Sequence, residues 1–344
     1  MLKEPRFQED RLALAKEQAL QDMKKRNDDS EDVEAREWNV LLYGEGHFSN
    51  RFTTAASIQS DHARRPRGLP PEIRAPRQHD RGGRPASFTR AAMIQKLEAA
   101  FASWPGTAAS GSARALRDPD RGPGIYRIQK DVNQGRVSIG LPSVRRGDPD
   151  AYALEVMNEI LGGSGFTSRI TKTVRSDEGL AYSAGSGLGF GVYYPGSFRA
   201  EFQSKSRSVS YAASLVLQEI KGMREKPVTA EELDTIKRNL IETFPSTFNS
   251  KAQTVAIFAA DEYTKRDPSY WQTYRDRINA VTAADVQRVA QKYLVPEKLV
   301  VLVVGDQKEI DLGDGKHQTS LEALAEGRKV VVLPLRDPLT MKRP

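Results

Sequence analysis

Residues 161–183 read LGGSGFTSRITKTVRSDEGLAYS, a glycine-rich bend followed by a short polar stretch and the start of an alternating segment. Glycines at 162, 163 and 165 let the backbone adopt conformations that other residues reach rarely, so the chain can turn sharply there. We expect a short helix over 166–175 and a strand over about 179–190. Arg175 therefore ends the expected helix, and Tyr182 lies near the start of the expected strand.

The regular elements on both sides of this bend predict the fold class. Strands are expected at 125–129, 135–142, 196–203 and 298–304, and helices at 149–161, 206–225, 250–266, 268–280 and 282–294. Thr229 and Glu232 have the spacing of a capping box that opens one further helix. This order of elements predicts an α+β fold, a mixed α/β sandwich with helices packed on one face of a largely antiparallel sheet.

The chain divides into segments of different character. Before the regular part, helices are expected at 8–25, 31–43 and 88–103. Residues 105–124 are rich in Pro, Gly and Ser and are expected to be a linker. Residues 125–306 form the main predicted domain, and 307–344 are expected to be an appended tail with a short strand at 329–333.

Composition limits the classes of function. The 344 residues contain no cysteine, which excludes disulfides, thiolate metal sites and a cysteine nucleophile. The formal charge of +7 raises the question of nucleic acid, but seven arginines in 63–85 face only two acidic residues there, so the excess is local. That run has no interleaved aromatic residues and no recognised module, and we expect no nucleic-acid partner.

The bend closely resembles the C-terminal domain of the insulinase/pitrilysin family of zinc peptidases, which includes the mitochondrial processing peptidases. In that family a glycine-rich turn begins a short helix, and an Arg and a Tyr seven residues apart frame the sequence GLAYS. The matching residues here are Arg175, Gly179, Leu180, Ala181 and Tyr182. The resemblance covers about 8–60 and 88–305. It implies a two-domain repeat whose first repeat, within 1–104, is incomplete.

The same resemblance implies that Arg175 and Tyr182 bind a peptide substrate, together with Gly179, Leu180 and Ala181. A phenol can donate to an oxyanion, and a guanidinium can hold a peptide carbonyl through fixed donors, so both side chains suit this role. From spacing alone a second interpretation stays open, in which Arg175 caps a helix and Tyr182 packs within a strand.

The zinc motif of the family is absent from this chain. Relatives bind zinc through His-x-x-Glu-His on a helix, in which two histidines are ligands and the glutamate is the general base. The four histidines here, at 47, 62, 79 and 317, include no such pair. Counted back from Tyr43, Asp22 falls at the third-ligand position and Ala15 at that of an assisting glutamate. We expect no metal and no catalytic residue here, and zinc in a full-length relative or a partner subunit.

Residues 62–87 interrupt the resemblance. The family has a helix and a strand in this region, whereas this stretch is rich in Arg and Pro and has no period. One hypothesis is a frameshift compensated downstream, because a shifted reading of 69–83 can resemble the family. We expect the stretch to be irregular and poorly packed.

These features predict an insulinase-like protein that supplies the substrate-binding half of a zinc metalloendopeptidase and is inactive alone. Its expected partners are a peptide substrate and either a zinc-bearing peptidase subunit or a second copy of the chain. The alternative is a structural, non-catalytic family member. No segment resembles a signal peptide or a membrane span, which leaves the cytoplasm or, if the N-terminus is truncated, the periplasm or export.

Overall fold

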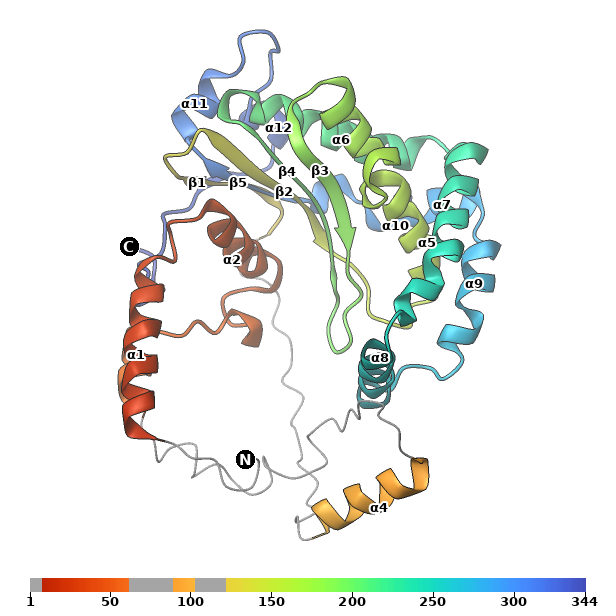
Figure 1. The fold of residues 1–344 in the computed structure, drawn as a ribbon. Coiled ribbons are helices and arrows are strands. Elements are labelled where there is room, and N and C mark those ends of the chain that lie inside the picture. Colours follow the sequence, from red (N-terminus) through yellow and green to blue (C-terminus); the bar gives the residue numbers. More distant parts are fainter. Residues whose placement is uncertain (1–7, 62–88, 103–121) are drawn as a thin grey trace.

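A six-stranded sheet forms the centre of the molecule (Figure 1). The structure is a computed structural model and describes residues 8–61, 89–102 and 122–344. The strands are β1 Gly124–Gln129, β2 Gln134–Pro142, β3 Ala181–Leu188, β4 Ser197–Lys205, β5 Val300–Gly305 and β6 Val330–Val332. They lie in the order β3-β4-β2-β5-β1-β6. β1 is parallel to β5 and β6, whereas the other neighbouring pairs are antiparallel.

One face of the sheet carries most of the helices and the larger core. The helices from this part of the chain are α5 Ala151–Asn158, α6 Val209–Glu225, α7 Ala230–Thr243, α8 Lys251–Thr264, α9 Tyr270–Ala280 and α10 Ala283–Tyr293. On α6, Val209, Ala212 and Val216 are fully buried, because their spacing of three and four residues places them on one side of the helix. The expected capping box at Thr229 and Glu232 opens α7.

The opposite face of the sheet is covered by α2 Ser30–Tyr43, which comes from the N-terminal part of the chain (Figure 1). Val33, Trp38 and Leu41 of α2 belong to a second core cluster. On the sheet side this cluster includes Tyr126 of β1 and Leu302 of β5, both fully buried. β1 and β5 therefore contribute to core clusters on both faces of the sheet.

The predicted α+β class is confirmed, with one correction to the layers. The expectation placed helices on one face of the sheet, and α2 occupies the second face as well. The physical reason is visible in β5, where every residue is buried. An uninterrupted apolar strand needs cover on both faces, in contrast to the alternating pattern of a strand with one solvated face.

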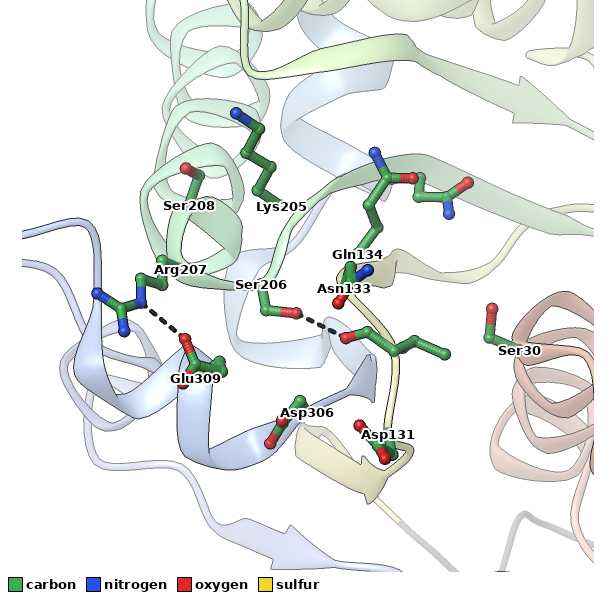
Figure 2. Close-up of a pocket in the computed structure, with 12 residues that line it drawn as sticks. Ser30, Asp131, Asn133, Gln134, Lys205, Ser206, Arg207, Ser208, Asp306 and Glu309 are labelled. Atoms are coloured by element: carbon green, nitrogen blue, oxygen red, sulfur yellow. Dashed lines mark hydrogen bonds and ion pairs between the residues drawn. The ribbon is translucent and has the colours of Figure 1, made fainter.

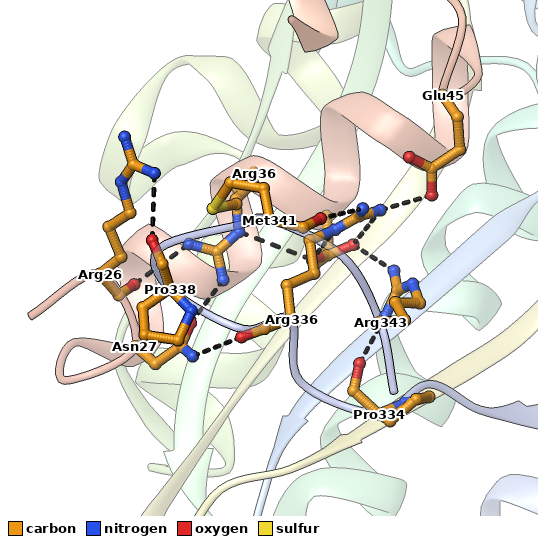
Figure 3. A network of polar contacts seen from close by, with 10 residues as sticks. Arg26, Asn27, Arg36, Glu45, Pro334, Arg336, Pro338, Met341 and Arg343 are labelled. Carbon is orange, nitrogen blue, oxygen red and sulfur yellow. Dashed lines mark hydrogen bonds and ion pairs between the residues drawn. The ribbon is translucent and has the colours of Figure 1, made fainter. Parts of the chain in front are cut away.

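The C-terminal segment 307–344, expected to be an appended tail, packs against the rest of the molecule. It contains α11 Gln307–Leu312, α12 Leu321–Ala325 and β6. Figure 3 shows how its last residues meet the N-terminal helices. Arg336 donates to the Glu37 carboxylate on α2 at 2.9 Å and to Glu45 at 2.5 Å, and Arg343 also pairs with Glu37. Arg336 and Glu37 are 4% and 1% exposed, so this contact lies inside the fold.

Three further α-helices come from the described N-terminal part of the chain. They are α1 Glu9–Lys24, α3 Ala55–Ser60 and α4 Arg90–Phe101. α4 has no buried residue. The stretch 62–87, which was expected to be irregular, and most of the expected linker 105–124 lie outside the described residues. Among the helices of the described ranges, none is both long enough and apolar enough to cross a membrane.

Candidate substrate-binding site

The glycine-rich bend folds as a series of irregular helical turns beside the edge strand β3. A π-helical turn at Glu159–Gly163 continues α5, a 3-10 turn follows at Gly165–Thr167, and a second π-helical turn spans Thr171–Asp177. Gly162 is required there, because a Cβ atom at this position would lie 2.4 Å from the backbone nitrogen of Ser186 on β3. The helix therefore approaches the strand more closely than a side chain would allow. π turns inside helices occur frequently at functional sites.

Buried contacts fix the second π turn against β3. The Thr171 hydroxyl donates to the carbonyl of Ala184 at 2.6 Å, and Val174 is fully buried. The turn ends at Gly179, whose φ of +61° is left-handed and favours glycine. The Leu180 amide then donates to the Val174 carbonyl at 2.9 Å, which closes the turn and starts the strand.

This ending brings the two predicted side chains together. The guanidinium carbon of Arg175 lies 4.9 Å from the ring centre of Tyr182 and 4.5 Å from that of Phe166. Tyr182 is 86% exposed and Phe166 is 70% exposed. Ala181 is buried and Leu180 is half-buried, so these two residues anchor the strand while Tyr182 projects into solvent. The geometry differs from the interpretation in which Tyr182 packs within a strand.

The arrangement is a cation held between two exposed aromatic rings. Cation–π contacts hold a guanidinium in place while leaving most of its N–H donors at the surface. Exposed aromatic groups of this size mark interaction sites on soluble proteins. The cluster can therefore contact an apolar side chain and donate hydrogen bonds to a peptide backbone. Phe166 was not predicted, although an aromatic residue inside a glycine-rich bend has little room to be buried and could have been noticed.

A pocket of about 560 Å³ lies on the other side of the bend and is also lined by Phe166. Arg169 spans it with two hydrogen bonds to Glu232, of 2.7 and 2.8 Å. The hydrogen bond from Arg169 lowers the pKa of Glu232, since it stabilises the ionised carboxylate. The same Glu232 caps α7 by accepting from the Thr229 amide at 2.8 Å. This ion pair ties the bend to α7.

A second pocket, of about 750 Å³, lies between the β1–β2 turn and the start of α6 (Figure 2). Its polar groups bind one another. Arg207 pairs with Glu309 at 2.7 Å, and Ser206 donates to the carbonyl of Val132 at 3.2 Å. None of the predicted site residues lines it.

The residues considered for zinc do not fit a metal site. Asp22 is exposed on α1, as is Ala15. His47 is buried among aromatic rings, its Nδ1 lies 2.6 Å from the Ser49 hydroxyl, and burial lowers its pKa. His317 pairs with Asp314 at 2.7 Å. Within the described ranges no group of three or more His, Cys, Asp or Glu residues could hold a metal ion. The two remaining histidines, at 62 and 79, lie outside those ranges.

The sequence matches found among known proteins are to peptidases and peptidase-like proteins. Residues 87–240 match the family described as "Peptidase M16 inactive domain". The "Uncharacterized zinc protease YmxG" of Bacillus subtilis (strain 168) is 23% identical over 216 residues, 61% of this chain and 50% of that protein. The "Non-peptidase homolog YmxG" of Helicobacter pylori is 27% identical over 193 residues, 53% of this chain and 42% of that protein. The chain thus spans about half the length of these relatives.

Solved structures agree on the fold. The crystal structure of a peptidase M16 inactive domain from Pseudomonas fluorescens has a TM-score of 0.70 and 22% identity, and the match covers 88% of this chain and 72% of that one. A chain of Complex III2 from Candida albicans, with Inz-5 bound, has a TM-score of 0.64 and 12% identity, with 84% and 71% covered. At these identities the likeness concerns the fold alone, which occurs both in an isolated domain and in a multi-subunit assembly.

Proposed function

We propose that this chain, whose residues 87–240 match the family described as "Peptidase M16 inactive domain", binds extended peptides for a zinc metalloendopeptidase without cleaving them itself. The binding residues in this proposal are Arg175, Gly179, Leu180, Ala181 and Tyr182, with Phe166 added by its contact to Arg175. The name of the Helicobacter pylori relative, a non-peptidase homologue, is consistent with an inactive member.

The observation that carries the proposal is the exposure of the Phe166 and Tyr182 rings, with the half-buried Arg175 against both of them, on a rigid support. The backbone beneath it is fixed by buried contacts of Thr171 and Val174, so the exposed groups are presented without much loss of freedom on binding. Nothing in the folding of the domain needs a phenol that is 86% exposed. Binding of a ligand that covers both rings and accepts hydrogen bonds from Arg175 would account for their exposure.

In this proposal the zinc is carried elsewhere. The described residues offer no fitting ligand set, and Asp22 lacks histidines beside it. The metal would come from a zinc-bearing peptidase subunit, from a full-length version of the protein, or from an assembly of copies that includes such a subunit. The incomplete first domain, proposed within residues 1–104, would contact the zinc-bearing subunit. Zinc in that partner would polarise the scissile carbonyl and activate water.

Peptide binding can be measured by fluorescence anisotropy with a labelled pool of random unstructured peptides. We expect Arg175→Gln to weaken binding by about 10- to 100-fold, because a hydrogen bond from a charged donor contributes about 1.5–3 kcal/mol. Tyr182→Phe should weaken it by a smaller factor, since the ring contact is kept. Tyr193→Phe is the matched control, because Tyr193 is 64% exposed but lies in the loop between β3 and β4. No binding, or equal binding by all four proteins, would refute the proposal.

The metal part of the proposal has a separate test. Native mass spectrometry of the purified chain with added zinc is expected to show no one-to-one complex, and the same peptide pool is expected to remain intact. A stoichiometric zinc adduct would show that this chain holds the metal by itself.

A structural, non-catalytic role is the second candidate, and the exposure of the cluster also supports it. The same rings could pack against a folded partner protein rather than an extended peptide. The anisotropy experiment separates the two. A peptide pool that fails to bind, in a preparation that is folded by circular dichroism, would favour the structural role.

A further inference from the structure

We propose that a third pocket, formed where three loops meet, binds an anionic group such as a carboxylate or phosphate. The pocket has a volume of about 510 Å³ and lies between the β2–α5 loop, the β3–β4 loop at Val192 and the corner joining α8 to α9. This corner is at the opposite end of β3 from Tyr182, about eight residues or roughly 25 Å along the strand. The pocket is thus separate from the proposed peptide site.

The lining of the pocket is strongly basic. Five of its side chains are Arg or Lys, whereas two are carboxylates. Both carboxylates bind their own turns. Asp148 accepts from the Asp150 amide at 2.9 Å, and Asp267 accepts from the amide and hydroxyl of Ser269 at 2.8 and 2.7 Å. Both carboxylates thus help to hold the loops. Since Lys265 is paired with Glu262 at 3.0 Å, the excess of positive charge in the pocket comes mainly from its arginines.

Two of the basic side chains, Arg146 and Arg266, lie close enough to repel each other. Burial lowers the pKa of Arg146 and the nearby charge of Arg266 lowers it further, whereas the Asp261 carboxylate opposes this shift. Arg266 pairs with Asp261 at 2.6 Å. Arg146 instead donates to the neutral hydroxyl of Thr264 at 2.8 Å, and in the described part of the chain it forms no ion pair with a carboxylate. An anion beside Arg146 would offset this repulsion.

Aromatic rings hold the charged groups in position. The guanidinium carbon of Arg266 lies 4.1 Å from the ring centre of Tyr270, which in turn stacks on Tyr152 with ring centres 6.1 Å apart. The backbone of Arg146 is fixed by a 2.7 Å hydrogen bond from its amide to the carbonyl of Gly191. Since both arginines are restrained before any ligand arrives, little freedom is lost on binding. Guanidinium forks match the planar oxygen pairs of carboxylates and phosphates.

The bound anion is either a free small anion or a carboxylate of an acidic peptide. Isothermal titration calorimetry on the full chain can distinguish the two. One arm titrates inorganic phosphate. The other titrates a capped, amidated peptide rich in glutamate, with its glutamine counterpart as the uncharged control. We expect Arg146→Gln to weaken anion binding about tenfold, because one charge-assisted contact is lost. Raised salt should weaken binding by the wild type, since part of the attraction is electrostatic.

Two further variants keep the test decisive. Arg277→Gln removes an exposed charge of the same pocket and should also weaken binding. It replaces Arg146→Gln in the test if that variant proves unstable. Arg207→Gln is the matched control, because it removes an exposed arginine that lies on a different pocket and pairs with Glu309. Binding of phosphate alone would identify a free small anion as the ligand, and binding of the glutamate peptide would identify an acidic peptide. The proposal fails if neither anion binds, or if Arg207→Gln weakens binding as much as Arg146→Gln.

Discussion

Two regions of the molecule use arginine in opposite ways. Where the C-terminal segment meets α2, Arg336 is nearly inaccessible to solvent and is paired with Glu37 and Glu45 (Figure 3). At the bend, Arg175 lies between the exposed rings of Phe166 and Tyr182. The first arrangement satisfies every requirement of a buried charge. The second leaves a cation and two rings at the surface.

This difference separates residues that hold the fold from residues that are available to a ligand. A buried ion pair makes a fold depend on both partners, because removal of one leaves the other as a buried charge without a counter-charge or hydration. An exposed cation–π cluster contributes little to stability and can be covered by another molecule. Variants in the two regions should therefore separate stability from binding.

The largest effect is expected at the buried pair. Glu37→Ala leaves Arg336 inside the fold with Glu45 as its remaining carboxylate and should lower the free energy of unfolding by about 3–5 kcal/mol. Urea denaturation followed by circular dichroism measures this change. Glu31→Gln is the control, because Glu31 pairs with Arg136 at the surface and should cost at most about 1 kcal/mol. Equal costs for the two variants would mean that the buried contact does not hold the C-terminal segment in place.

A smaller loss is expected where the bend touches β3. Gly162→Ala places a methyl group 2.4 Å from the Ser186 nitrogen, so the helix or the strand must move, at a cost of about 1–3 kcal/mol. Gly222→Ala in α6 is the matched control, since a Cβ there meets nothing within 4 Å. That substitution should stabilise the helix by roughly 0.5–1 kcal/mol. Because Gly162 positions the bend, its variant should also weaken peptide binding, and unchanged binding would show that the cluster tolerates displacement.

The sequence was sufficient to predict elements whose evidence is local. The helix expected at 206–225 and the capping box at Thr229 follow from apolar spacing and from two residues three positions apart, and both are present. The contact between Arg336 and Glu37 joins residues 299 positions apart, and no periodicity reports it. For that reason the C-terminal segment was expected to be an appended tail and α2 was not assigned to the sheet.

The candidate site shows the same limit. The motif spacing placed Arg175 and Tyr182 on adjacent elements, and they lie within 4.9 Å of each other, although their role in binding stays a prediction. The two π-helical turns could not be predicted, because they depend on how closely Gly162 approaches β3. Phe166 could have been noticed as an aromatic residue inside a glycine-rich bend, but its contact with Arg175 is visible only in the structure.

The pH dependence of stability probes a second buried carboxylate on α2. Burial raises the pKa of Glu34 above its ordinary value of 4.5, even though Arg199 and the Ser138 hydroxyl at 2.5 Å oppose the shift. A raised folded-state pKa means that the contribution of Glu34 to stability is fully present below pH 4.5 and decreases as the pH rises through the folded-state pKa. Glu34→Gln lacks this titration, so the stability difference between wild type and variant should shift in favour of the variant as the pH rises. Urea midpoints over this range test the sign, and a difference that is independent of pH would contradict it.

The smallest effect on stability is expected at the bend cluster, where the effect on binding should be largest. Arg175→Gln removes a guanidinium that packs against exposed rings, and Tyr182→Phe removes the hydroxyl of a side chain that is 86% exposed. Each should change the free energy of unfolding by no more than about 0.5 kcal/mol. Urea midpoints measured on the same preparations used for anisotropy check this directly. Loss of peptide affinity with unchanged stability can arise only from groups that contact the ligand. If Arg175→Gln instead destabilises the protein as much as Gly162→Ala, Arg175 stabilises the bend. The contrast between Arg336 as a structural residue and Arg175 as a ligand-binding residue then no longer holds.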